Sequence, residues 1–78
     1  MTLVEQFHRV SPETDAGVRR EVAGATWFEL AAATSRAHRE VDEALRGRDD
    51  DVLGRALARH AVLERVLAEA TERLHPPR

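Results

Sequence analysis

Two long segments of this sequence repeat apolar residues every three or four positions, and a short stretch rich in glycine and aspartate, 47–51, separates them. A period of about 3.6 residues is typical of amphipathic helices. We therefore expect a helix from Trp27 to about Arg46 and another from Asp51 to Leu74. The predicted inward residues of the first are Trp27, Leu30, Ala31, Thr34, His38, Val41 and Leu45. Those of the second are Leu53, Ala56, Leu57, His60, Leu63, Leu67, Ala70 and Leu74.

The turn between these helices carries the residues that end one helix and begin the next. Gly47 suits the C-cap of the first helix, because glycine adopts the left-handed conformation without steric cost. The three aspartates that follow offer an N-cap and negative charge for the start of the second helix. The sequence thus predicts an all-α fold, a small helical bundle built on a long antiparallel helical hairpin.

The first 25 residues predict one or two shorter helices. Thr2 opens a capping box for a helix over 2–10, and Ser11 followed by a proline begins a second helix. Gly24 interrupts the pattern, and Thr26 then starts a new capping box. The alternative is one continuous helix kinked at Gly24.

Length and composition restrict the class of protein. The 78 residues fit a single helical domain over 1–75 with a disordered tail over 76–78. The absence of cysteine excludes disulfides and thiol catalysis, and a net charge of −2 argues against direct nucleic-acid binding. No apolar stretch approaches the roughly 20 residues that span a bilayer, and no secretory signal is visible. We expect a cytoplasmic protein without a membrane contact.

No catalytic constellation is visible in the sequence. The serines and threonines have no base placed to activate them, and there is no glycine-rich phosphate loop. Most charges instead form pairs of opposite sign four residues apart, which indicates a solvated helix face. These pairs are Arg36 with Glu40, Arg39 with Glu43, Asp42 with Arg46, Asp51 with Arg55, and Arg65 with Glu69.

Two of the four histidines, His38 and His60, are the candidate site. Both belong to the predicted inward stripes, and they lie equally far from the turn, so an antiparallel pair of helices places them at one level. Neutral histidine is the commonest side-chain ligand of transition metals. Asp42 and Glu64 follow the two histidines at i+4 spacing as further ligands or hydrogen-bond acceptors, and His8 is a fifth candidate.

The alternative is a structural role for the same two histidines. As amphipathic residues at the edge of the helix interface, they would form hydrogen bonds to each other, to water or to the nearby carboxylates. The sequence has neither an H-E-x-x-H motif nor a paired E-x-x-H motif, so it lacks the patterns of zinc proteases and of di-iron carboxylate proteins.

Residues 37–61 resemble the last two helices of the FCD ligand-binding domain found in the FadR branch of GntR-type transcription regulators. The matching residues are His38, Val41, Ala44, Leu45, Asp49, Ala56, Leu57 and His60, and the two histidines are 22 positions apart. The resemblance implies that His38 and His60 help bind a divalent metal beneath a pocket for a small carboxylate. It does not extend to the upstream helices of that domain or to a DNA-binding winged helix, so other residues would have to complete such a site.

The two long helices also predict self-association. At about 1.5 Å per residue they span roughly 30 and 36 Å, and the shorter helices before them are too few to cover both. A second copy normally buries such a stripe, so we expect a homodimer. The candidate interface residues are Trp27, Phe28, Leu30, Leu63 and Leu67.

Trp27 and Phe28 are adjacent and point about 100° apart on a helix, so one can fill the core and the other an interface. A core role is the simpler interpretation, and an anchor for a partner is the alternative. Two hypotheses for function follow. The chain is a noncatalytic helical interaction and dimerisation module, or a metal- or small-ligand-binding sensor that uses His38 and His60.

Overall fold

The structure is a computed structural model, and it describes residues 10–75. It contains three helices and, within those residues, no strand: α2 (Pro12–Glu21), α3 (Trp27–Gly47) and α4 (Asp50–Leu74). The predicted all-α class is confirmed. The helix expected over 2–10 lies, except for Val10, outside the described residues, and so does the tail over 76–78.

Helices α2 and α3 begin at the caps that the sequence predicts. The Ser11 side chain accepts a hydrogen bond from the backbone N–H of Thr14 at 3.1 Å, and a proline occupies the first turn of α2. At the start of α3, the Thr26 hydroxyl accepts from the backbone N–H of Glu29 at 3.1 Å, and the Glu29 carboxylate accepts from the N–H of Thr26 at 3.0 Å. This reciprocal pair satisfies two amides that a helix end leaves free.

A turn over 22–26 separates α2 from α3. Gly24 lies at a φ of 81°, in the left-handed region that favours glycine, and the N–H of Ala25 bonds to the carbonyl of Val22 at 3.0 Å. Two helices are therefore present here, and the alternative of one kinked helix is wrong.

The turn between α3 and α4 is displaced by one residue from the prediction. Gly47 is the last residue of α3, and Arg48 takes the left-handed conformation, with a φ of 61°. Asp49 is the N-cap of α4, and its carboxylate accepts from the N–H groups of Asp51 and Val52. Because Asp49 is held in this way, Arg48 is the residue that must reverse the chain, although it is not a glycine.

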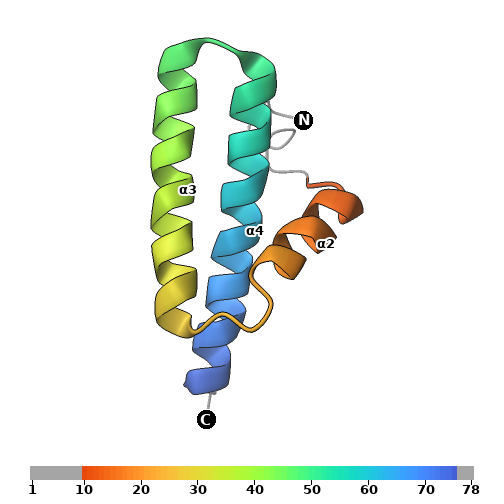
Figure 1. The fold of residues 1–78 in the computed structure, drawn as a ribbon, viewed down its shortest axis with the longest axis vertical. Coiled ribbons are helices and arrows are strands. Elements are labelled where there is room, and N and C mark those ends of the chain that lie inside the picture. The colour runs from red at the N-terminus through yellow and green to blue at the C-terminus, as the bar shows by residue number, and fades with distance from the viewer. Residues whose placement is uncertain (1–9, 76–78) are drawn as a thin grey trace.

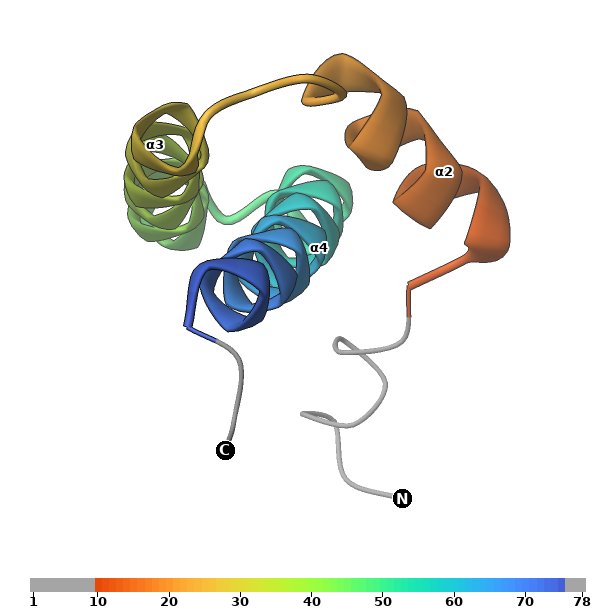
Figure 2. The same ribbon diagram turned by 90° about the horizontal axis from the view of Figure 1, so that it is seen from below.

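Helix α4 is the centre of the fold. Helices α3 and α4 run antiparallel side by side, and α2 lies against α4 at an incline (Figure 1). Seen along the helix axes, α3 and α2 are on different sides of α4 (Figure 2). The contacts between helices are therefore those of α4 with α3 and of α4 with α2.

The core is small and made of small residues. Its main cluster contains four residues of α4, three of α3 and one of α2: Val62, Leu63, Val66, Ala70, Leu30, Ala33, Ala37 and Val18. Val62 and Leu63 are the only large side chains among them that are completely buried. No polar side chain is buried in the described part of the chain.

The predicted inward stripes are partly wrong. His38, Leu45 and Leu74 were expected to face inward, but all three are exposed, and Ala33, Ala37 and Ala44 are buried in α3 instead. Alanine is only weakly hydrophobic, so the predicted inward stripe was assigned to larger apolar residues nearby. Small side chains at these positions allow two helix backbones to approach closely.

Arginine links α2 to α4. The Arg19 guanidinium donates two hydrogen bonds to the Glu69 carboxylate, at 2.8 and 3.1 Å, and a third to Asp15 at 2.6 Å. Arg59 donates to Glu21 at 2.6 Å near the end of α2. None of the five pairs expected within single helices forms an ion pair in the described residues. The ion pairs there join Arg19, Arg59 and Arg65 to carboxylates of α2 and α4, and each of the two histidines contacts a carboxylate of its own helix.

The left-handed residue in the turn gives a first prediction. Arg48→Gly should raise the free energy of unfolding by about 0.5 to 1 kcal/mol, because glycine removes the steric cost of this conformation but adds freedom to the unfolded chain. Arg39→Gly, at an exposed position in the middle of α3, is the matched control and should lower it by about 1 kcal/mol. Urea unfolding measures both free energies. An equal loss of stability in the two variants would contradict the left-handed conformation of Arg48.

The Arg19–Glu69 contact gives a second prediction. The hydrogen bonds from Arg19 hold the pKa of the Glu69 carboxyl below its usual range. The stabilisation is therefore present above the ordinary glutamate pKa of about 4.3 and is lost as pH falls through the lowered value. Between pH 6 and pH 3, Glu69→Gln should lose slightly less stability than the wild type, because solvent screens so exposed a pair and its contribution is small.

Glu72→Gln is the control for that experiment, because Glu72 is on the same helix and forms no ion pair among the described residues. It should lose as much stability on acidification as the wild type. A Glu69→Gln variant with the wild-type pH dependence would show that the contact adds nothing to stability.

Candidate functional site

The structure brings His38 of α3 and His60 of α4 together. Their ring centroids are 5.4 Å apart and the ring planes are inclined at 52°. The two positions are equally distant from the turn, so the antiparallel course of α3 and α4 places them at the same level. This part of the prediction from the sequence is confirmed.

The histidine pair lies at the edge of the helix interface and not inside it. The His38 side chain is 64% exposed, whereas that of His60 is 20% exposed. Ala37 and Val41 occupy the inward positions beside His38, so the prediction that His38 faces inward is wrong. The two rings therefore meet where solvent reaches them.

Each histidine faces the carboxylate one turn further along its own helix. His60 Nε2 is 3.1 Å from Glu64 Oε1, and His38 Nε2 is 3.8 Å from Asp42 Oδ2. The i+4 spacing places each pair on one side of its helix, as the sequence predicts.

The separation of the two rings is compatible with one shared metal ion. With metal–nitrogen bonds of about 2.1 Å and tetrahedral angles, two imidazoles on one ion have centroids roughly 5 Å apart. In residues 10–75, however, no group of three or more His, Asp or Glu side chains is arranged to hold a metal ion. His8, the remaining candidate ligand, lies outside the described residues. The described residues thus provide two imidazoles and no third ligand at the same point.

The residues expected at an interface separate into two groups. Leu30 and Leu63 are buried in the core of this single chain, and Leu67 is half-buried against that core. Trp27 is also half-buried and packs against the core, and its indole N–H donates to the Thr71 hydroxyl at 2.9 Å. Phe28 is 79% exposed, which fits the division of roles expected for these adjacent aromatics.

Phe28 belongs to an apolar hollow at the end of the helix pair away from the turn. Its ring packs edge-on against Trp27, with centroids 5.3 Å apart. Leu74, which is also exposed, and His75 complete a hollow of about 330 Å³. Large apolar side chains are thus on the surface, whereas alanine and valine fill most of the core.

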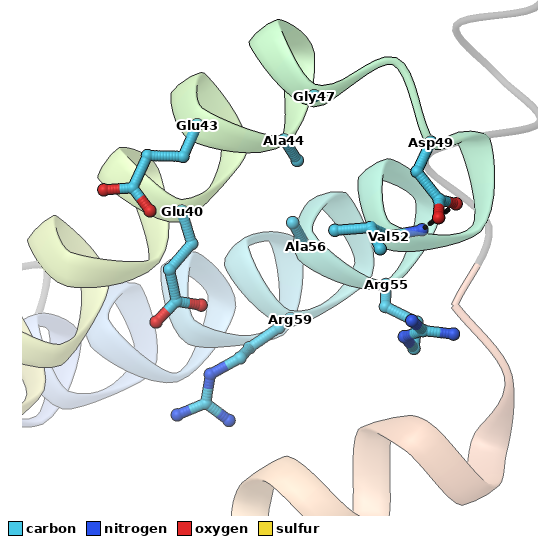
Figure 3. A pocket seen from close by; sticks show the side chains of 9 residues that line it. All are labelled: Glu40, Glu43, Ala44, Gly47, Asp49, Val52, Arg55, Ala56 and Arg59. Carbon is cyan, nitrogen blue, oxygen red and sulfur yellow. Dashed lines mark hydrogen bonds between the residues drawn. The ribbon is translucent and has the colours of Figure 1, made fainter.

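A second hollow, which the sequence interpretation missed, lies near the turn (Figure 3). Its volume is about 480 Å³. Glu40 and Glu43 of α3 stand on one side, and Arg55 and Arg59 of α4 stand on the other, with small side chains between them. The signal in the sequence was the position of these residues relative to the turn, since Glu43 and Arg55 are each six residues from Asp49, and Glu40 and Arg59 are nine and ten residues from it. We call this hollow the turn groove.

No family model, curated protein or solved structure matches this chain. The resemblance of residues 37–61 to the FCD domain therefore stays a prediction. In the part of the chain that the structure describes, no helix has the length and apolar composition needed to cross a bilayer. The features of residues 10–75 that bear on function are the histidine pair, the exposed apolar residues and the turn groove.

Proposed function

We propose that this chain is a noncatalytic helical interaction module that associates with a second copy of itself. The observation that carries this proposal is the placement of its apolar side chains. Phe28, Leu45 and Leu74 are exposed, whereas most buried residues are alanine and valine. A chain of this length obtains most of its stability from burial of apolar surface, so large apolar side chains left outside the core indicate a further contact.

The lengths of the helices support the same proposal. Helices α3 and α4 contain 21 and 25 residues, whereas α2 contains 10 and contacts only α4. At about 1.5 Å per residue, α2 covers roughly 15 Å of a helix that is more than twice as long. Residues 10–75 of a single chain therefore leave much of the long antiparallel helix pair without a covering element, and a second copy would provide two more long helices.

Self-association gives a direct prediction. For a dimer that unfolds to separate chains, a tenfold increase in protein concentration, from about 10 to about 100 μM, should raise Tm by about 4 °C. Sedimentation equilibrium over the same range should give a mass approaching twice that of the 8.7 kDa chain. A Tm that does not change with concentration, together with the mass of one chain throughout, would contradict the proposal.

A second candidate function is a sensor that binds a divalent transition metal or a small ligand at His38 and His60. The observation that favours it is the 5.4 Å separation of the two rings, each with a carboxylate one turn away. The resemblance to the FCD domain is in agreement with this candidate. Further ligands would come from water, from a second copy, or from His8.

Metal removal tests this candidate. If His38 and His60 bind a metal, protein purified without a histidine tag should contain it, and a chelator should lower Tm, because a ligand bound only by the folded chain stabilises it. His38→Ala and His60→Ala should abolish both the metal content and the chelator effect. His75→Ala is the control and should retain both. Equal metal content and equal Tm in all four proteins would exclude the sensor.

A further inference from the structure

The turn groove has walls of opposite charge. Glu40 and Glu43 form the α3 wall, and Arg55 and Arg59 form the α4 wall. Among the described residues, neither glutamate forms an ion pair, and neither does Arg55, whereas Arg59 binds Glu21 of α2. Within residues 10–75, three of the four charged groups thus have no ion-pair partner in their own chain.

The floor of the turn groove is made of small residues. Ala44, Gly47 and Ala56 line it, together with Val52, which is 41% exposed (Figure 3). Small residues allow another helix to approach closely. Helix α2 ends beside Arg59, where Glu21 binds, so this groove adjoins the surface on which α2 packs, and no residue of α2 lines it.

We propose that a second copy of this chain occupies the turn groove, with α3 of each copy packed over α4 of the other. This inference rests on the proposed self-association and assigns its interface. A two-fold axis brings the same patch of both copies together, so a patch must be complementary to itself. Walls of opposite charge satisfy that condition, because the glutamate wall of one copy then faces the arginine wall of its partner.

The positions of the charges fit this arrangement. Glu43 is six residues before Asp49 and Arg55 is six residues after it, so the two lie at the same level of the antiparallel pair. Each Glu43 can therefore face the Arg55 of the other copy, and symmetry gives two such contacts. The alternative two-fold arrangement, α3 over α3, would place glutamate against glutamate and is disfavoured by their repulsion.

The position of α2 limits how the two copies can cross. Helix α2 is inclined across α4, and its last residues, where Glu21 binds Arg59, lie farther from the turn than its first residues (Figure 1). Parallel stacking over the full length of α4 would meet α2 of the other copy. If the two helix pairs cross at an angle near 50°, which is common for packed helices, the contact is confined to the half of each pair that is nearer its turn.

A second copy fits the turn groove better than other classes of partner. A nucleic acid or an anionic membrane would meet Glu40 and Glu43, and the whole chain has a net charge of −2. A uniformly basic partner would meet Arg55 and Arg59. The occupant must carry both signs at the spacing of the two walls, and the same groove in a second copy has that pattern.

Charge reversal tests the assignment. Glu43→Arg places arginine against Arg55 of the partner, and Arg55→Glu places glutamate against Glu43, so each variant alone should self-associate at least about tenfold more weakly than the wild type. An equimolar mixture of the two variants should form a 1:1 heterodimer, because both of its contacts join opposite charges. The double variant E43R/R55E should regain the self-association of the wild type.

Matched controls separate this effect from a change in net charge or folding. Glu72→Arg and Arg39→Glu reverse exposed charges outside the turn groove, and both should associate as the wild type does. Circular dichroism should show equal helicity in every variant, because the side chains of Glu43 and Arg55 make no hydrogen bond among the described residues. Sedimentation equilibrium gives the dissociation constants.

Two outcomes distinguish this inference from the proposed function. If the wild type is a monomer at every concentration, self-association itself is wrong and the assignment falls with it. If the wild type dimerises but Glu43→Arg and Arg55→Glu dimerise equally well, self-association stands and the turn groove is not its interface. Failure of the mixture to form a heterodimer would also overturn the assignment.

Discussion

Burial of Val62 and Leu63 on α4 is the contact on which the rest of the structure depends. Both side chains are completely buried, and they are consecutive, so they point about 100° apart on the helix. One helix can thereby bury two neighbouring faces, against α3 and against α2, although α2 and α3 make no substantial contact with each other. Loss of the α4 helix would remove the support of every other element.

Local signals in the sequence predicted most of the helix boundaries, because they depend on short-range chemistry. Ser11, Thr26 and Asp49 cap helices through hydrogen bonds to amides two or three residues away, and such contacts can be inferred from sequence spacing alone. The turn between α3 and α4 shows the limit of this reasoning. Glycine is favoured in the left-handed conformation, yet Arg48 adopts it, because the cap at Asp49 determines which residue must reverse the chain.

Long-range features could not be predicted in the same way. Leu45 was expected inside and Ala37 was not considered, since hydropathy favours the larger residue, whereas close packing of α3 on α4 selects the smaller one. Arg19 was not singled out, because its partner Glu69 is 50 residues away in the sequence. The histidine pair was predictable for a geometrical reason, since equal distance from a turn places two residues at one level, but their exposure depends on the rotation of each helix about its axis.

The histidine pair and the turn groove are on different faces of α4, although their residues are neighbours in the sequence. Arg59 borders the turn groove and His60 belongs to the histidine pair, and consecutive residues of a helix point about 100° apart. The residues that line the groove do not include either histidine or its carboxylate. A second copy seated in the groove would therefore leave both imidazoles accessible to solvent. The proposed self-association and the proposed ligand binding thus use different faces of this helix pair, so evidence for one is not evidence for the other.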